Sequence, residues 1–276
     1  MPAFRYVIAD VFTDVPLAGN QLAVFTDARD IPEESLQPLA REIGFSETVF
    51  VYPAQGEGHA RMRIFTPGTE VPFAGHPTLG TAFVLAGPLQ LDEIRLETGR
   101  GVVPVRLERD GRSIVFGRMA QPVPSVEPFA GADALLDALG VDSELPVELY
   151  DNGIRHVYVA LRSTGEVAAL APDFARVAAA AGPVGVNCFA GEGSSWQTRM
   201  FHPAFGVAED PATGSAAGPL ALHLARHGRI GFGDEIEIRQ GAEIGRPSTL
   251  YAVARSPEEI EVGGSAVVVA RGEFRL

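Results

Sequence analysis

The sequence contains no lysine, because all 22 of its basic residues are arginines. This absence excludes a Walker-type phosphate lysine, a Schiff-base lysine and a lysine general base. Cysteine is almost absent too, since Cys188 is the only one among 276 residues. A single thiol cannot form an internal disulfide, a catalytic thiol pair or a Cys-rich zinc site. Carboxylates and histidines therefore remain as the candidates for acid–base chemistry.

Long apolar runs and an excess of positive charge are also missing. No apolar stretch reaches the length of about 18 residues that a membrane span needs, and the opening residues, MPAFRYVIADVF, lack the segments of a signal peptide. We therefore expect a soluble, cytoplasmic protein without a membrane partner. The 35 acidic residues outnumber the basic ones and leave a formal net charge of −13. Such a charge repels nucleic acid, so we expect no nucleic-acid partner.

The sequence patterns of common metal and phosphate sites, HExxH, the EF-hand loop and GxGxxG, are absent. His223 and His227 have the i, i+4 spacing of a helical metal pair, but no third ligand lies nearby in the sequence. We interpret them as the end of a helix stopped by Gly228, where cationic side chains are favourable. The sequence therefore predicts no bound metal.

A weak internal repeat is the main feature that the sequence does contain. "FTPGTEVPFAGHPTLGTAFVLAG" (65–87) and "FHPAFGVAEDPATGSAAGPLALHLARHG" (201–228) share Phe-x-Pro, an acidic residue, a Pro, a Gly turn and an apolar helix closed by Gly87 or Gly228. A helix that is apolar all round is buried. We predict an α+β fold of two similar lobes, each a sheet or barrel wrapped around a central helix. The N-terminal lobe spans 1–120, the C-terminal lobe spans 121–262, and 263–276 returns to the N-terminal lobe.

The other expected elements follow from alternating and helical patterns. They are strands near 4–12, 19–25, 47–53, 60–66, 184–190 and 196–202, helices near 31–43 and 173–181, and a Pro-containing linker at 121–128.

The starts of the two central helices are the expected site of chemistry. Backbone N–H groups and the positive end of the helix dipole can hold a substrate carboxylate or a developing enolate oxygen without lysine, arginine or metal. A neighbouring carboxylate can then transfer a proton. Glu209 and Asp210 lie next to the second helix start. From the sequence alone, Asp210 could equally be a simple helix cap.

Three segments resemble the phenazine biosynthesis PhzF-like family: "GFSETVFV" (44–51), "FTPGTEVPFAGHPTLGTA" (65–82) and "EDPATGSAAG" (209–218). Their order and spacing cover essentially the whole chain, and together they are specific. The resemblance implies the diaminopimelate epimerase fold, an active site between the lobes, and isomerisation by proton transfer with no cofactor. Diaminopimelate epimerases and proline racemases, which share this fold, use a cysteine pair. Cys188 cannot supply one and is expected as a buried strand residue.

The resemblance also implies roles for individual residues. Glu47, which periodicity alone would place as an ordinary strand-edge carboxylate, becomes the general base and acid. His76 becomes a proton relay or substrate contact, and Asp210 becomes a second carboxylate in the cleft. The expected substrate-binding residues are Asn20, Ser46, Gly75, Gly214 and Ser215.

Three functions remain open at this point. The first is an isomerase that moves a proton on a small carboxylated substrate. The second is a racemase or epimerase of an amino-acid-like acid, with Glu47 and Asp210 on opposite faces of the carbon. The third is a non-catalytic protein that uses the same cleft to bind a small ligand. Members of the family commonly pair, so we also expect a homodimer, to which a strand at 267–274 could contribute.

Overall fold

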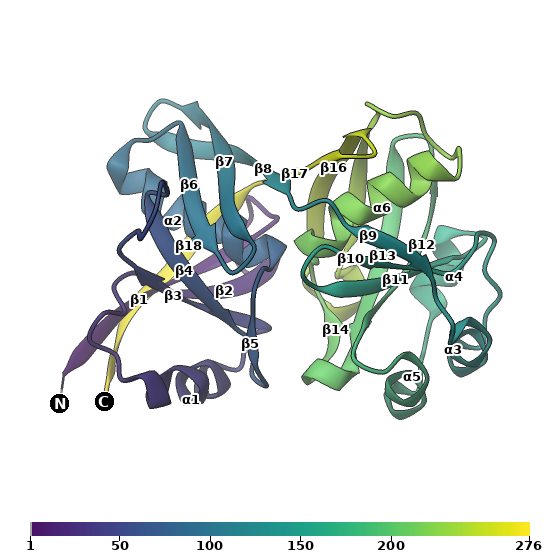
Figure 1. The fold of residues 1–276 in the computed structure, drawn as a ribbon, viewed down its shortest axis with the longest axis horizontal. Coiled ribbons are helices and arrows are strands. Elements are labelled where there is room, and N and C mark those ends of the chain that lie inside the picture. The colour runs from purple at the N-terminus through teal and green to yellow at the C-terminus, as the bar shows by residue number, and fades with distance from the viewer. Residues whose placement is uncertain (1) are drawn as a thin grey trace. The chain divides into compact units, whose positions relative to one another are not determined.

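A computed structural model describes residues 2–276 of the chain. The chain divides into two compact units, which are described separately. The first unit runs to Ala120 and is completed by Gly263–Leu276, and the second unit is Gln121–Val262. Figure 1 shows how the last strand, in yellow, returns to lie beside the first strand, in purple. None of the helices in the described part of the chain has both the length and the hydrophobicity of a membrane span.

The first unit surrounds one buried helix with strands. Its elements are β1 (Ala3–Val11), β2 (Asn20–Phe25), α1 (Glu33–Ile43), β3 (Glu47–Tyr52), β4 (Ala60–Phe65), β5 (Glu70–Val71), α2 (Gly75–Leu89), β6 (Glu93–Thr98), β7 (Gly101–Asp110), β8 (Ser113–Gln121) and β18 (Ala266–Arg275). Helix α2 is buried without interruption from Gly75 to Val84 and packs against β1, β2, β3, β6, β7 and β18. It carries no charged residue, which is why burial on every side is possible.

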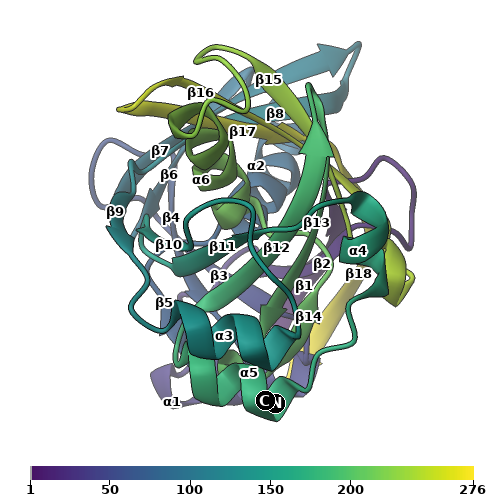
Figure 2. The ribbon, with the colours of Figure 1, turned by 90° about the vertical axis from the view of Figure 1, so that its right-hand side faces the viewer.

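The second unit repeats this arrangement. Its elements are β9 (Ser125–Pro128), α3 (Ala132–Leu139), β10 (Glu148–Asp151), β11 (Arg155–Ala160), α4 (Thr164–Ala169), α5 (Phe174–Ala181), β12 (Gly185–Glu192), β13 (Ser195–His202), the 3-10 helix η1 (Pro203–Phe205), β14 (Val207–Asp210), α6 (Gly214–Arg226), β15 (Glu235–Gln240), the 3-10 helix η2 (Ala242–Ile244), β16 (Ser248–Ser256) and β17 (Glu259–Gly264). Helix α6 is buried from Gly214 to Leu224 and packs against β15 and β16, as Figure 2 shows.

The repeat extends to the directions of the corresponding strand pairs around each buried helix. In the first unit β2 is parallel to β3, β4 is antiparallel to β3 and β5, and β6 is parallel to β4 and antiparallel to β7. In the second unit β11, β12, β13, β14, β15 and β16 pair in the same order and directions. Each unit therefore places the start of its buried helix directly after a short strand, β5 or β14.

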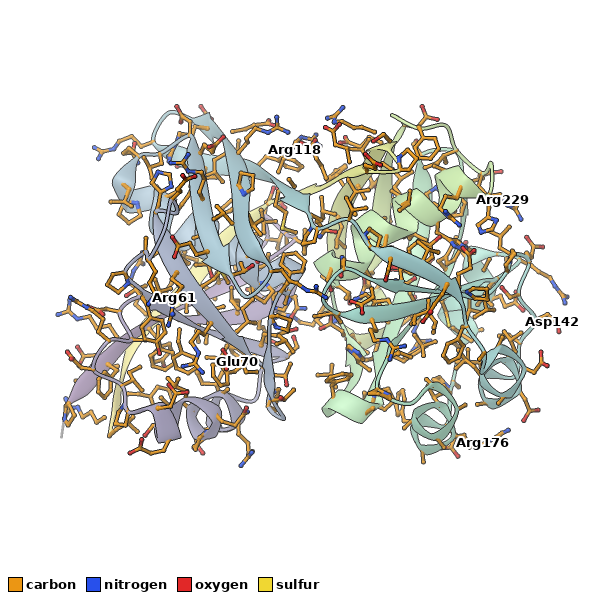
Figure 3. All side chains as sticks on the ribbon, in the orientation of Figure 1. Arg61, Glu70, Arg118, Asp142, Arg176 and Arg229 are labelled. Carbon is orange, nitrogen blue, oxygen red and sulfur yellow. The ribbon has the colours of Figure 1, made fainter. Side chains whose placement is uncertain are left out.

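Each unit has a further apolar core under its outer helices. In the first unit, Leu36 and Leu39 of α1 pack with Phe25 and Phe50, whose rings stack with centroids 5.0 Å apart. In the second unit, α3 and α5 cover an apolar face that includes Phe201. Charged side chains such as Arg176 and Arg229 extend outward from the second unit (Figure 3).

Three local predictions were wrong or incomplete. Helix α2 does not end at Gly87, because it continues through Pro88 to Leu89 and is capped by Gln90 in the left-handed conformation, with φ of 53°. The predicted linker at 121–128 ends in a strand, β9, which pairs antiparallel with β10 and tolerates Pro128 because this residue lies at an end of the pairing. The short helices α3 and α4 were not predicted. Helix α6 ends at Arg226 with Gly228 left-handed beyond it, close to the predicted stop.

Candidate active site

In the first unit, the N-terminal ends of β2, β3 and α2 lie close together. Strands β2 and β3 are parallel and pair with Leu22 opposite Glu47, so Asn20 and Glu47 lie at the same edge of the sheet. The turn before β2 requires Gly19, whose φ is +67° and whose added Cβ would collide with the carbonyl oxygen of Val11. The loop after β5 then brings the first residues of α2 to this edge.

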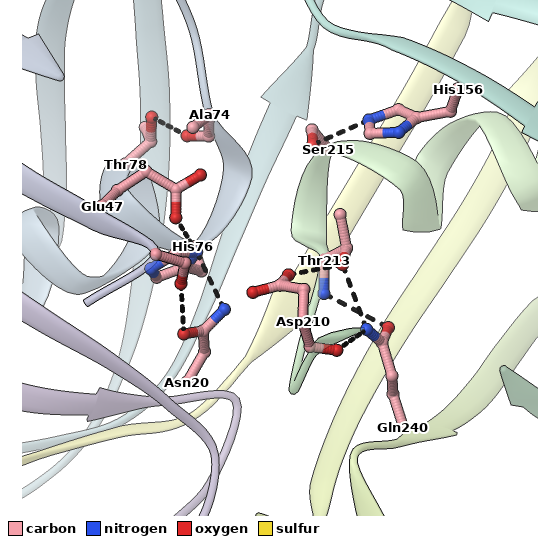
Figure 4. A network of polar contacts seen from close by, with 11 residues as sticks. Asn20, Glu47, Ala74, His76, Thr78, His156, Asp210, Thr213, Ser215 and Gln240 are labelled. Carbon is pink, nitrogen blue, oxygen red and sulfur yellow. Dashed lines mark hydrogen bonds and ion pairs between the residues drawn. The ribbon is translucent and has the colours of Figure 1, made fainter. Parts of the chain in front are cut away.

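The side chains at this edge form one hydrogen-bonded network (Figure 4). The Ser46 hydroxyl donates to Asn20 Oδ1 at 3.0 Å, and Asn20 Nδ2 lies 3.2 Å from His76 Nδ1. His76 Nδ1 also lies 3.5 Å from Glu47 Oε2. Because the Ser46 hydroxyl orients the Asn20 amide, the amide N–H donates to Nδ1, and this network assigns the proton of a neutral His76 ring to Nε2. Four of the predicted site residues are therefore connected.

Burial sets the charge of His76. Its side chain is only 3% exposed. Burial lowers the pKa of His76 to about 3, although a backbone hydrogen bond with Gln21 acts in the opposite direction. The imidazole is therefore neutral at physiological pH, and its contact with Glu47 is not an ion pair. The Glu47 side chain is 15% exposed as a whole, although its Oε2, which faces His76, is buried.

In the second unit, Asp210 ends β14 and lies four residues before α6 begins. Asp210 Oδ2 accepts a hydrogen bond from the Thr213 hydroxyl at 2.5 Å. Gln240 Nε2 donates to the Asp210 carbonyl at 2.7 Å and to Thr213 Oγ1 at 3.0 Å, while its Oε1 accepts the Thr213 N–H at 3.2 Å. The residue that caps α6 is Thr213. Thr213 makes no side-chain capping hydrogen bond of its own, and Asp210 accepts the hydroxyl of this N-cap residue.

The first turn of α6 is held from several sides. Ser215 Oγ lies 3.1 Å from His156 Nε2, and burial together with His202 keeps the pKa of His156 well below its usual value. The backbone carbonyls of the turn accept three side-chain hydrogen bonds, from Gln121 to Gly214, from Asn152 to Ser215 and from Tyr158 to Ala216, at 2.7, 2.8 and 2.7 Å. The N–H groups of Gly214 and Ser215 have no partner inside the helix, because first-turn N–H groups never do. These contacts therefore fix the backbone of the first turn of α6.

Sequence reasoning missed most of the residues that support these sites. His156, Thr213 and Gln240 come from β11, the β14–α6 loop and β15, and no local pattern connects them. Only Thr213 stood inside a recognised motif.

The neighbouring carboxylate Glu209 has a different task from Asp210. Arg199 donates to both Glu209 oxygens at 2.8 and 2.7 Å, and both side chains are less than 10% exposed. The first unit carries the same pair, because Arg63 donates twice to Glu70, which Figure 3 labels on β5. The two arginines open matching segments, "RIFTP" (63–67) and "RMFHP" (199–203). Glu209 is therefore part of a duplicated structural pair and not a second acid in the site.

The chain is similar to known proteins over almost its entire length. Residues 9–272 match the family described as phenazine biosynthesis-like protein. The chain is 50% identical over 277 residues to the trans-2,3-dihydro-3-hydroxyanthranilate isomerase of Pseudomonas aeruginosa, with 99% of each covered. It is 30% identical over 292 residues to an uncharacterized isomerase of Escherichia coli O157:H7, with 97% of each covered.

Solved structures show the same similarity. A phenazine biosynthesis protein of the PhzF family from Bacillus anthracis superposes with a TM-score of 0.84 at 27% identity, and 100% of each chain is covered. A hydroxyproline epimerase from Agrobacterium vitis superposes with a TM-score of 0.67 at 13% identity, covering 99% of this chain and 91% of the other, and so shares the fold alone. The prediction of a fold that mixes helices and strands is confirmed, and the fold is dominated by a large sheet.

Proposed function

Because the chain belongs to the phenazine biosynthesis-like family and is an isomerase, we propose that it moves a proton between two carbons of trans-2,3-dihydro-3-hydroxyanthranilate. The observation that carries this proposal is the 50% identity, over 99% of both chains, to an isomerase of that substrate. A non-catalytic ligand-binding role is not favoured, since the curated relatives are named as isomerases.

Glu47 is the proposed proton carrier. Without lysine and without a thiol pair, the base must be a carboxylate or a histidine. His76 is too weak a base for the task, because burial lowers its pKa to about 3. Glu47 is 15% exposed, stands at the start of a strand and lies 3.5 Å from His76 Nδ1. It takes a proton from one carbon of the substrate and returns the proton to another.

Neutral His76 supports this cycle through the tautomer that Asn20 imposes. Its Nδ1 presents a lone pair towards Glu47 Oε2 at 3.5 Å. Nδ1 offers a single lone pair, so a Glu47 carboxyl that has just taken up a proton can donate its O–H to Nδ1 in place of the Asn20 amide. The network therefore stabilises the protonated form of Glu47 during the interval between the two proton transfers. Ser46 contributes by fixing the orientation of the Asn20 amide.

The helix starts supply the complementary electrophilic groups. The proposal assigns the backbone N–H groups of Gly75, Gly214 and Ser215 to the substrate carboxylate and to the negative charge that develops during proton abstraction. The Ser215 hydroxyl, oriented by His156, assists them. Asp210 acts by orienting Thr213 at the start of α6. In this proposal the enzyme is a homodimer and needs neither a metal nor a cofactor for chemistry.

The repeat favours a single proton carrier over the two opposed bases of a racemase. Glu47 opens β3 opposite Leu22, whereas the corresponding strand β12 opens at Gly185 opposite His156. The second unit thus has no carboxylate at the position equivalent to Glu47. Asp210 is the remaining candidate for a second base, and one of its oxygens accepts the Thr213 hydroxyl.

The test is turnover of trans-2,3-dihydro-3-hydroxyanthranilate by the wild-type protein and by Glu47→Gln. The variant keeps the size of the side chain but cannot accept a proton, so we expect a rate loss of about 10²- to 10⁴-fold. Glu42→Gln, an exposed change of the same type on α1, is the matched control and should retain wild-type turnover. Circular dichroism confirms that each variant is folded.

Solvent deuterium incorporation separates the two mechanisms. In heavy water, a single-carrier isomerase with Glu47→Gln loses exchange completely, and Asp210→Asn reduces it by a smaller factor. Exchange that survives in each variant from only one face of the substrate would instead favour the racemase. A folded Glu47→Gln protein with near wild-type turnover would remove Glu47 from the mechanism.

A further inference from the structure

The C-terminal end of α6 carries a cluster of nitrogen and oxygen ligands that is separate from the candidate active site. His223 and His227 lie one turn apart on the helix, and Glu148 reaches them from the start of β10. One ligand atom of each residue lies within 4.8 Å of the others. The sequence offered only the two histidines, because Glu148 is far away along the chain. The tertiary structure supplies the missing third ligand.

We propose that Glu148, His223 and His227 form a binding site for a divalent zinc ion. Two imidazole nitrogens and one carboxylate oxygen are a ligand set that zinc accepts in proteins. Tetrahedral zinc with bonds of about 2.0–2.2 Å places its ligand atoms about 3.3–3.6 Å apart. Glu148 Oε2 lies 3.3 Å from His223 Nδ1 and 3.0 Å from His227 Nε2, and all three ligand atoms lie within 4.8 Å of one another, so small side-chain shifts would bring them to that spacing.

The burial of the three side chains suits an ion that enters from solvent. The His223 side chain is fully buried, and its Nδ1 faces Glu148 Oε2 and the Tyr150 hydroxyl. The side chains of Glu148 and His227 are 14% and 20% exposed, which leaves a route for the ion to enter.

A closed hydrogen-bonded cluster is the competing explanation. Tyr150 donates to Glu148 Oε2 at 2.9 Å, and Arg226 places a guanidinium nitrogen 3.6 Å from Glu148 Oε1. These contacts can satisfy the carboxylate without a metal. Zinc would displace the proton of the hydrogen bond between His227 Nε2 and Glu148. The Tyr150 hydroxyl would stay protonated and remain a donor, because burial raises its pKa.

Zinc in this position would have a structural effect. It would tie the end of α6 to β10, while the first turn of α6 holds Gly214 and Ser215. A helix of 13 residues separates the two ends, a distance of about 20 Å. The ion would therefore stabilise the second unit without entering the chemistry, and the inference does not depend on the identity of the substrate.

The experiment is a calorimetric titration of the chelator-treated, full-length protein with zinc chloride. We expect one zinc per chain and a higher melting temperature in the presence of zinc. His227→Gln removes one ligand at a partly exposed position and should weaken zinc binding by at least about 100-fold. Arg226→Gln changes the adjacent side chain, which is not a ligand, and should bind zinc as tightly as the wild type or more tightly. Glu47→Gln should also bind normally, which distinguishes this site from the candidate active site.

Glu148→Gln provides a second ligand variant, and the fluorescence of Trp196 on β13 reports whether each variant has folded. The absence of stoichiometric zinc binding to the wild type would overturn the proposal in favour of the closed hydrogen-bonded cluster. Zinc binding that is unchanged in both His227→Gln and Glu148→Gln would overturn it as well, because the ion would then bind elsewhere.

Discussion

The arginine–glutamate pair that occurs in both units allows one interaction to be compared in a buried and an exposed setting. Arg199 and Glu209 share two hydrogen bonds of 2.8 and 2.7 Å, and their side chains are 8% and 6% exposed. Arg63 and Glu70 share two hydrogen bonds of 2.7 Å, but Glu70 is 43% exposed. The geometry is the same in both pairs. The pairs differ in burial and in their further partners, because Arg63 also pairs with Glu33 whereas Arg199 also donates to the Leu170 carbonyl.

Substituting the glutamate by glutamine should therefore have very different effects in the two units. Glu209→Gln keeps the volume but leaves the buried Arg199 guanidinium without its counter-charge, which costs about 3–5 kcal/mol of unfolding free energy. Glu70→Gln leaves Arg63 in contact with water and with its second partner, Glu33. Exposed pairs contribute about 0–1 kcal/mol, so the loss should be at most of that size.

Urea unfolding measures the difference. Trp196 is the only tryptophan and lies on the same strand as Arg199, so its fluorescence reports on the second unit, while far-UV circular dichroism follows the whole chain. With a urea dependence of about 3 kcal/mol/M, the midpoint should fall by about 1–1.7 M in Glu209→Gln and by at most about 0.3 M in Glu70→Gln. Equal midpoint shifts in the two variants would refute the argument that burial decides the contribution of this pair.

Three further predictions concern pH, metals and assembly. Burial lowers the pKa of His76 to about 3 and the pKa values of His202 and His223 to about 4. Because the unfolded value is about 6.5, unfolding takes up protons below that pH, and the melting temperature should fall steadily as the pH drops from 6.5 towards 4; a constant melting temperature over that range would contradict this. Turnover should survive exhaustive chelation, even where the proposed zinc is removed, and a rate restored only by an added divalent ion would contradict a metal-free mechanism. Sedimentation should show a dimer, and a species of only 29.2 kDa at micromolar concentration would argue against it.

Features that depend on residues close together in the sequence were predicted well. The family and the isomerase class follow from three short motifs, and the comparisons confirm both. The burial of the two central helices follows from their lack of charge, and α2 and α6 are buried over their first ten residues. Cys188 was expected as an inert strand residue, and it is fully buried in β12, where burial raises the pKa of its thiol to about 12.

Adjacent carboxylates show where the local pattern stops being informative. Glu209 and Asp210 are consecutive in the sequence, and both are acidic residues next to a helix start. Successive side chains of a strand point to opposite faces. Glu209 consequently meets Arg199, while Asp210 meets Thr213. The alternation alone predicts that the two side chains lie on opposite faces of the strand, but it does not predict which residue each of them contacts.

The sequence by itself determined which side chains could carry chemistry, because the lack of lysine and of paired cysteines leaves carboxylates and histidines. Only the tertiary structure decided which of these groups meet. The parallel pairing of β2 with β3 brings Asn20 to Glu47 and His76, and the placement of β10 beside the end of α6 brings Glu148 to His223 and His227. Both sets of contacts join residues that are distant along the chain. Strand register and helix packing produce these contacts. The periodicity of a single helix or strand carries no information about the segment that it will contact.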